Sequence, residues 1–258
     1  MVVFVAACLG LLCGSFTNVL IARVPVGEQW RTGSSRCPRC GAEIAWYDNI
    51  PVVSWLLLRR RCRHCHEPIS GRYPLVEVAV ALLFALAASA FGATILTVAM
   101  AYLAVISVAL AAIDLEHMRL PDALTLPAYP VLAVLIAAHA GLEHDWWILV
   151  RALIGVAIVG GVYLVLWLAY PKGMGFGDVK TAGMLGLALG AVGWGAIAVG
   201  AIAGPFIGGV VGIVVMVRER RGRGVHIPYG PWLLAGAWLG ILAGPPIAHA
   251  YLQWTTGA

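Results

Sequence analysis

The stretch "TILTVAMAYLAVISVALAAID", residues 94–114, decides the fold of this chain. Residues 94–113 carry no charge, and a helix of about 20 apolar residues is long enough to cross the hydrocarbon core of a bilayer. The run ends at Asp114, where the chain becomes polar. We therefore expect a transmembrane helix that delivers an aspartate to one face of the membrane.

Comparable apolar runs recur along most of the chain. Of its 258 residues, 61% are hydrophobic and 11% are charged, a balance typical of a membrane protein rather than a soluble globule. The other expected spans are 2–22, 74–91, 123–140, 147–170, 180–198, 199–217 and 231–253. The sequence thus predicts an all-α polytopic membrane protein with about eight transmembrane helices. Glycines blur the border within 191–203, so seven or nine spans also fit.

The basic residues predict the orientation, because cytoplasmic loops collect Lys and Arg. With eight helices, one face receives sixteen of the 17 basic residues, and only Arg151 lies near the other face. The sixteen are Arg23, Arg31, Arg36, Arg39, Arg59, Arg60, Arg61, Arg63, Arg72, Arg119, Lys172, Lys180, Arg218, Arg220, Arg221 and Arg223. We expect a protein of the cell (inner) membrane with this face in the cytosol and both termini outside.

The net charge of +5 then follows from topology and contact with anionic lipids, and needs no nucleic-acid partner. No cleavable signal is expected, because arginine and proline follow the first run.

The polar loop 23–73 contains two CxxC pairs. Cys37 and Cys40 form the first pair, and Cys62 and Cys65 the second, a spacing that suits one tetrahedral zinc ion. A pair of disulfides is the alternative, which a reducing cytosol disfavours. Four thiolates leave no open position for a substrate water, so we expect a structural Zn²⁺ that orders the loop. His64 and His66 could substitute as ligands, although a place as solvated neighbours suits them better.

A second aspartate is expected on the same face as Asp114. Asp178 follows a glycine-rich turn in "GMGFGDVK", residues 173–180, at the start of the expected span 180–198. Two carboxyl groups at a membrane boundary indicate an aspartyl protease: one is ionised and draws a proton from water, and the other is protonated and polarises the scissile carbonyl. Gly175 and Gly177 would permit a tight turn and the approach of a substrate backbone. Lys180 lies at this approach and favours an ionised Asp178.

Each acidic residue also has a simpler interpretation. Asp114 could be a hydrated helix end, and Asp178 could cap the helix that it opens without losing a catalytic role. Asp122, in "LPD", is better read as a helix cap than as an acid. Glu77 stays open between an interfacial hydrogen-bonding group and a contributor to the site.

Six motifs, in order, resemble the type IV prepilin peptidases, a leader peptidase and N-methyltransferase family of GxGD-type membrane aspartyl proteases. They are "GSFTNVLIARVP" (14–25), "CPRC" with "WYDNIPVVSWL" (46–56), "CRHC" with "ISGRYPLVE" (69–77), "DLEHMRLPD" (114–122), "GMGFGDVK" (173–180) and "IPYGPWL" (227–233). The resemblance carries the family's catalytic aspartates to Asp114 and Asp178 and its zinc ligands to the four loop cysteines. One departure is "LLLRRRCRHC" (56–65), which has arginines where a glycine often precedes the second cysteine pair.

The resemblance implies the substrates and the second reaction. It implies cleavage after a glycine at the cytosolic end of the hydrophobic helix of type IV prepilins or type II secretion pseudopilins. Methylation of the new amino terminus by S-adenosylmethionine is implied by the resemblance alone. The residues themselves give no sign of it, because no nucleotide-binding glycine fingerprint is visible. The expected divisions are 1–22 as the first transmembrane helix, 23–73 as a cytosolic zinc-binding loop and possible methyltransferase region, and 74–258 as the transmembrane peptidase core.

Two other classes of protein would also explain parts of this sequence. A transporter could use Asp114 and Asp178 as proton or ion ligands, and a membrane scaffold could use the zinc loop only to bind a partner. A transporter site is expected near the bilayer midplane. Both aspartates are instead expected at the ends of spans, which favours the protease.

Overall fold

The computed structural model describes residues 1–29, 35–171, 174–219 and 228–256. Five of the basic residues used for the orientation lie outside the described residues: Arg31, Lys172, Arg220, Arg221 and Arg223. The described chain is helical, with two isolated antiparallel bridges in place of any strand. It divides into two compact units. Unit 1 is Met1–Ala93 with Met100–Ala109, and unit 2 is Thr94–Ala99 with Leu110–Ala258.

Two antiparallel helices, α1 (Val2–Arg23) and α3 (Arg72–Phe91), form the frame of unit 1. Glycines on α1 let the two backbones approach closely: a Cβ added at Gly10 would lie 2.6 Å from the Cα of Ala81, and one at Gly14 would lie 2.5 Å from the Cα of Glu77. Small residues at such contacts allow close packing of transmembrane helices, where dispersion supplies much of the attraction.

The loop between α1 and α3 contains only short elements. These are η1 (Val24–Val26), η2 (Trp46–Asn49) and α2 (Val53–Leu57), with bridges between Arg36 and Glu43 and between Arg61 and Pro68. Few of its described residues are buried, as expected of a loop without much core of its own.

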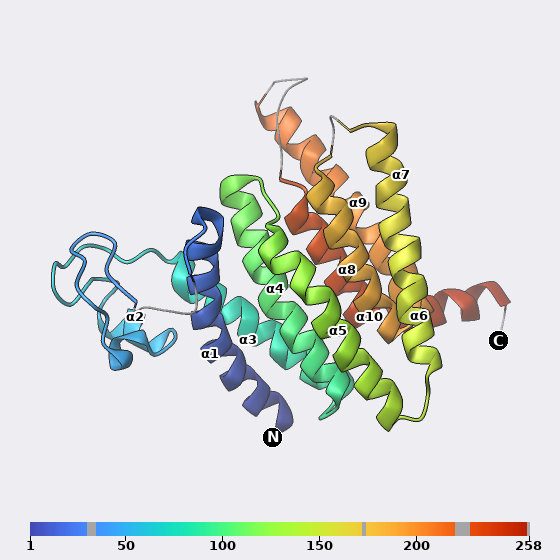
Figure 1. The fold of residues 1–258 in the computed structure, drawn as a ribbon, viewed down its shortest axis with the longest axis horizontal. Helices are drawn as coiled ribbons and strands as arrows, with labels where there is room; N and C mark the ends of the chain where they lie inside the picture. The colour runs from blue at the N-terminus through green and yellow to red at the C-terminus, as the bar shows by residue number, and fades with distance from the viewer. Residues whose placement is uncertain (30–34, 172–173, 220–227, 257–258) are drawn as a thin grey trace. The chain divides into compact units, whose positions relative to one another are not determined.

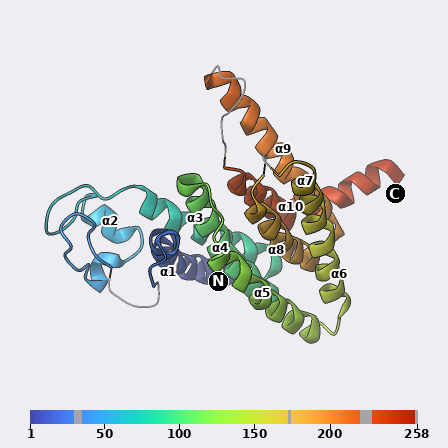
Figure 2. The ribbon, with the colours of Figure 1, turned by 45° about the horizontal axis from the view of Figure 1, so that its top comes forward.

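Unit 2 is a bundle built around one central helix. Its elements are α4 (Ile95–His117), which is shared with unit 1, α5 (Asp122–Leu142), α6 (Trp147–Gly155), the π-helical turn η3 (Val156–Gly160), α7 (Gly161–Ala169), α8 (Phe176–Val192), α9 (Trp194–Glu219) and α10 (Gly230–Thr256). Within this bundle α8 packs against α5, α6, α7, α9 and α10 (Figures 1 and 2). Almost all of α8 from Asp178 onward is buried.

Small residues also line the contact between α9 and α10. Gly236, Gly240 and Gly244 follow one another at intervals of four on α10, and each faces small residues of α9. A Cβ at Gly240 would lie 2.6 Å from the carbonyl oxygen of Ala196, so the two backbones nearly touch. This close packing explains why the last two helices are so rich in glycine.

The glycines near the boundary between the sixth and seventh expected spans have different structural roles. The sequence placed these spans at 180–198 and 199–217, which is wrong: α8 ends at Val192, Gly193 separates the helices, and α9 begins at Trp194. Gly195, by contrast, lies inside α9 and packs against α10. Hydropathy alone cannot distinguish a glycine that interrupts a helix from one that lets helices pack.

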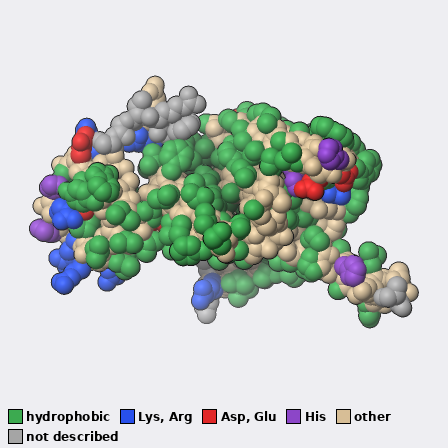
Figure 3. All heavy atoms as spheres, turned by 90° about the horizontal axis from the view of Figure 1, so that it is seen from below, with side chains coloured by type: hydrophobic (Ala, Val, Ile, Leu, Met, Phe, Trp, Pro, Cys, Tyr) green, Lys and Arg blue, Asp and Glu red, His purple; other side chains and the backbone are tan. Residues whose placement is uncertain are grey.

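The described helices have the lengths and composition of membrane spans. Seven of them, with α6 to α7 counted as one, are at least 18 residues long and sufficiently apolar. The eighth, α8, has 17 residues and is shielded from lipid by its neighbours. Hydrophobic side chains cover most of the helix surface seen in Figure 3, and charged side chains gather in a few places. The prediction of an all-α polytopic membrane protein with about eight spans is confirmed.

Candidate functional site

Asp114 lies one turn before the end of α4 and is buried. Its carboxylate oxygen Oδ2 accepts a hydrogen bond of 2.9 Å from the backbone N–H of Gly230, the first residue of α10. A Cβ at position 230 would lie 2.7 Å from this oxygen, so only glycine fits here without displacing the carboxylate. Asp114 is thus held between the end of one helix and the start of another.

Asp178 is the third residue of α8 and is also buried. Its Oδ2 accepts a hydrogen bond of 3.2 Å from the backbone N–H of Gly175, the N-cap residue. The alternative in which Asp178 is itself the N-cap is therefore wrong. The sequence placed the start of this span at Lys180, but α8 begins at Phe176 and its N-cap is Gly175. The carboxylate instead reaches back to the cap, which satisfies one amide and favours a negative charge at the helix N-terminus.

The two carboxyl groups belong to the same compact unit and interact electrostatically. In the described part of the chain, no lysine, arginine or histidine forms an ion pair with either one. Two buried carboxyl groups that share a site cannot easily both ionise, so one of them tends to keep a proton. This is the protonation pattern that an acid and base pair requires.

Leu120 packs against the first residues of both α8 and α10, the helix starts that hold this pair. A Cβ at Gly177 would lie 3.1 Å from the Cβ of Leu120, and a Cβ at Gly230 would lie 3.0 Å from its Cδ2. Gly177 therefore faces Leu120, and Gly175 faces the Asp178 carboxylate. The expected role of both glycines in substrate approach stays a prediction.

Lys180 pairs with Asp122 rather than with Asp178. Its Nζ lies 2.8 Å from each carboxylate oxygen of Asp122 and 5.2 Å from the centre of the Phe176 ring. Asp122 makes no capping hydrogen bond to α5, whose N-cap is Pro121. The sequence missed this pair because the two residues are far apart in the chain.

Two tyrosines that the sequence did not single out lie beside the aspartates. The hydroxyl groups of Tyr163 on α7 and Tyr229 lie 3.0 Å apart, and both interact electrostatically with Asp178. Tyr229 directly precedes Gly230, the donor to Asp114. The motif "IPYGPWL" contains Tyr229 and Gly230, but from the sequence alone it indicates only the start of a helix.

The four loop cysteines form one cluster in unit 1. Their sulfur atoms lie within 4.8 Å of one another, and the sulfurs of Cys37 and Cys65 are 3.8 Å apart. A tetrahedral ion with metal–sulfur bonds of about 2.3 Å needs sulfurs about 3.8 Å apart, so the cluster fits one zinc ion. All the cysteines are free thiols, and His64 and His66 are not part of the cluster.

Two similar backbone turns present these thiols. In the first, Gly41 donates to the carbonyl of Cys37, and in the second, His66 donates to the carbonyl of Cys62. Backbone N–H groups of Cys40 and Arg39 lower the pKa of the Cys37 thiol to about 6, which favours the thiolate that binds metal.

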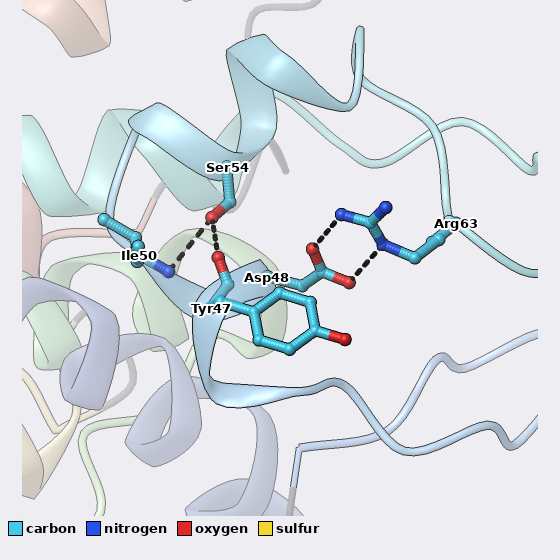
Figure 4. Close-up of polar contacts among 5 residues, drawn as sticks. All are labelled: Tyr47, Asp48, Ile50, Ser54 and Arg63. Atoms are coloured by element: carbon cyan, nitrogen blue, oxygen red, sulfur yellow. Dashed lines mark hydrogen bonds and ion pairs between the residues drawn. The ribbon is translucent and has the colours of Figure 1, made fainter.

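The segment between the two turns is held by its own polar contacts. The hydroxyl of Ser54 accepts from the N–H of Ile50 and donates to the carbonyl of Tyr47, while both guanidinium contacts of Arg63 reach the Asp48 carboxylate at 2.6 and 2.7 Å (Figure 4). The hydrogen-bonded Arg63 holds the pKa of Asp48 below its ordinary value. These contacts order the segment next to the cysteine cluster.

Glu77 connects this segment to α3. Its Oε2 accepts a hydrogen bond of 2.7 Å from the backbone N–H of Val52, and the residue is buried. Of the two alternatives that the sequence left open, the structure supports a hydrogen-bonding group.

Comparison with protein families identifies the chain. The model of the bacterial peptidase A24 N-terminal domain matches residues 8–91, and that of the type IV leader peptidase family matches 101–213. Curated relatives named prepilin leader peptidase/N-methyltransferase share 36% identity in Stutzerimonas stutzeri, across 98% of this chain and 94% of the relative, and 36% in Pseudomonas aeruginosa, across 95% and 92%. The chain belongs to the type IV leader peptidase family.

A third relative of the same name, from Myxococcus xanthus, shares 40% identity across 83% of this chain and 63% of its own length. No solved structure matched the chain. Family membership confirms the expectation of a membrane enzyme of the leader peptidase class, and the transporter alternative is not supported.

Proposed function

We propose that this chain is a membrane-embedded aspartyl endopeptidase that removes the leader of type IV prepilins or pseudopilins and then N-methylates the new amino terminus. One observation carries the peptidase assignment: Asp114 and Asp178, from helices far apart in sequence, are buried, interact with each other and have no cationic partner among the described residues.

The proposed cleavage uses the two carboxyl groups as base and acid. The ionised aspartate accepts a proton from water while the protonated aspartate donates a hydrogen bond to the carbonyl oxygen of the scissile bond. Water oxygen bonds to the carbonyl carbon, and collapse of the tetrahedral intermediate expels the amine of the mature pilin, which takes a proton from the dyad. The buried site holds both groups ready, as catalysis by a preorganised polar environment requires.

The Cys37, Cys40, Cys62 and Cys65 cluster fits a structural zinc ion. When bound, the ion would join the two halves of the loop and supply folding free energy to a segment with little core. Four thiolates would fill its coordination sphere, so this zinc takes no part in cleavage.

The position in the membrane is part of the same proposal. The catalytic face would lie in the cytosol and both termini outside, since the basic residues predict this orientation. Residues 23–73 would form the cytosolic loop linked to methyl transfer, and 74–258 the peptidase core. The cytosolic end of the substrate's apolar helix would reach the aspartates there.

The methyl transfer rests on the relatives' name and on the match of the N-terminal domain model to residues 8–91, which contain the four loop cysteines. The donor would be S-adenosylmethionine, whose sulfonium transfers a methyl group to an amine.

The test is to incubate the purified protein with a prepilin, with and without S-adenosylmethionine, and to weigh the products. We expect loss of the leader in both reactions and a further mass of one methyl group only with the donor. An uncut prepilin would refute the peptidase, and a cut product without the methyl mass would refute the second activity alone.

A further inference from the structure

Unit 1 contains a cavity of about 420 Å³ that the peptidase assignment does not use. Its walls come from α1, from the first turns of α3 and from the loop that carries the cysteine cluster. Cavities of about 300–1,000 Å³ are usual for small-molecule and cofactor sites.

Asn18 lines this cavity and has a hydrogen-bond acceptor without a partner. The side chain is 5% exposed, and its Nδ2 donates 3.1 Å to the carbonyl of Tyr73. Its carbonyl oxygen Oδ1 is buried and has no hydrogen-bond partner. A buried acceptor without a donor is destabilising, so its presence points to a donor that the protein itself does not supply.

Glu77 adds a carboxyl group to the same cavity. It is 7% exposed, accepts one N–H from Val52 and forms no ion pair within the described residues. Buried carboxylates are normally paired with a cation, so the cavity suits a positively charged ligand.

The backbone at Val52 is strained where it meets Glu77. Val52 has φ 60 and ψ −48, and the N–H of Val53 donates to the carbonyl of Pro51 at 2.6 Å, which makes a three-residue γ-turn. This turn is rare, and a left-handed φ is an outlier for a β-branched residue. Such strain clusters at ligand-binding and active sites.

Aromatic side chains complete the wall. Trp55 and Tyr73 both line the cavity, and the indole N–H of Trp55 donates 3.2 Å to the carbonyl of Ile69, which fixes the ring. A ligand with a flat ring system, several N–H donors and a positive charge would satisfy all these groups.

We propose that this cavity binds S-adenosylmethionine, with Asn18 accepting an N–H of the ligand and Glu77 facing its positive charge. The proposal rests on the proposed methyltransferase function. S-adenosylmethionine combines an adenine ring, an amino group and an ammonium group with a sulfonium, the features that the walls demand. Cys37 and Cys62 also line the cavity, so a metal bound to the cluster would hold its outer wall in place.

The test is equilibrium binding of radiolabelled S-adenosylmethionine to the purified full chain in lipid nanodiscs, without prepilin. Asn18→Leu keeps the side-chain size and removes the acceptor, and it should weaken binding at least about tenfold, as the loss of a buried hydrogen bond does. Thr17→Val is the matched control, because Thr17 is equally buried on α1, bonds only to the carbonyl of Cys13 and does not line the cavity. Cleavage by both variants should stay at the wild-type rate.

Unchanged affinity in Asn18→Leu, in protein that still cleaves prepilin, would overturn the assignment. Ultraviolet cross-linking of the ligand to wild-type protein supplies an answer that needs no variant. Adducts within residues 15–23 or 48–77 are expected, and adducts confined to unit 2 would contradict the proposal. A chain that neither binds the donor nor methylates would refute the methyltransferase function itself.

A second arm separates the methyl donor from the methyl acceptor, whose amino terminus is also a cation. A peptide that begins with the free amino terminus of a mature pilin is titrated against wild type and Asn18→Leu. The expected result is equal peptide affinity in both. A loss of peptide binding with intact donor binding would assign the cavity to the acceptor and refute the proposal.

Discussion

At the scale of single residues, each aspartate is held by the start of a helix. Asp178 accepts an N–H from Gly175 at the start of α8, and Asp114 accepts one from Gly230 at the start of α10. A helix N-terminus carries partial positive charge and favours a carboxylate. The sequence shows only that Asp114 ends its own helix, which favours a proton there. The structure adds the opposing influence of α10.

The sequence-based hypothesis that Asp178 is mainly the base and Asp114 mainly the acid therefore loses part of its support. Lys180, which was expected to favour ionised Asp178, pairs with Asp122 instead. The position of Asp178 at the start of α8 remains in its favour, and the assignment stays a prediction. Infrared spectra of the carboxyl groups in wild type and in each Asn variant measure where the shared proton lies.

Gly230→Ala should lower the rate of prepilin cleavage at least about tenfold, because an added methyl group would lie against the Asp114 carboxylate and displace it. A displacement of about 1 Å at a catalytic group can lower the rate about a hundredfold. Gly209→Ala is the control, since a Cβ there meets nothing within 4 Å and the residue also lies in a helix. Equal cleavage by both variants would show that the Gly230 contact does not position Asp114.

The sequence singled out Asp114 and Asp178, because each stands where an apolar run meets polar residues. It did not show the polar contacts that Asp114 and Asp122 make. Gly230 lies 116 residues from Asp114, and Lys180 lies 58 residues from Asp122, so only the packing of helices brings these groups together.

At the scale of elements, strained loop turns and glycine-lined helix contacts are the features that the sequence least revealed. Arg59 and Arg60 have φ values of 50 and 63 just before the second cysteine pair. They belong to the run of arginines that stands where a glycine is expected from the resemblance, and their left-handed backbone explains why a glycine would suit this turn. The departure therefore costs stability in the loop.

Arg59→Gly should stabilise the metal-loaded loop. Relief of the left-handed strain contributes about 1–2 kcal/mol, and the greater freedom of glycine in the unfolded chain offsets about 0.5–1 kcal/mol. Slower release of metal to a chelator and a higher unfolding temperature would measure the gain. Arg61→Gly is the matched control: Arg61 is equally exposed, has no positive φ and lies in the bridge to Pro68, so its replacement should destabilise the loop.

A larger residue in the contact between α9 and α10 should separate these helices. Gly240→Val would place side-chain atoms against Ala196 and Gly200, and such overpacking costs typically about 1–3 kcal/mol. Reduced thermal stability in detergent measures the effect. Leu239→Val serves for comparison, since Leu239 is 43% exposed and a change there should leave stability nearly unaltered.

At the scale of the whole molecule, composition predicted the fold class well because the bilayer leaves few options. A backbone inside lipid must satisfy its own hydrogen bonds, so long apolar runs become helices. The number of helices followed from counting these runs. Their boundaries did not, because α8 is buried by other helices and needs no full-length apolar run of its own.

The cysteine cluster and the aspartate pair lie in different units, which predicts that the two activities can be separated. Replacement of Cys37 and Cys40 by serine should release about one zinc per chain and loosen loop 23–73. We expect methylation to fall further than cleavage. Metal analysis together with the two product masses measures this, and wild-type protein without zinc would refute the metal assignment.

The account depends most on the claim that Asp114 and Asp178 are the acid and base of one protease site. The direct measurement is the rate of prepilin cleavage by Asp114→Asn and by Asp178→Asn, each purified from membranes in the folded state. Asparagine nearly keeps the size of aspartate but can neither hold nor release the proton, so each variant should lose cleavage, while binding of S-adenosylmethionine stays at the wild-type level. Substantial cleavage by either variant would contradict the account.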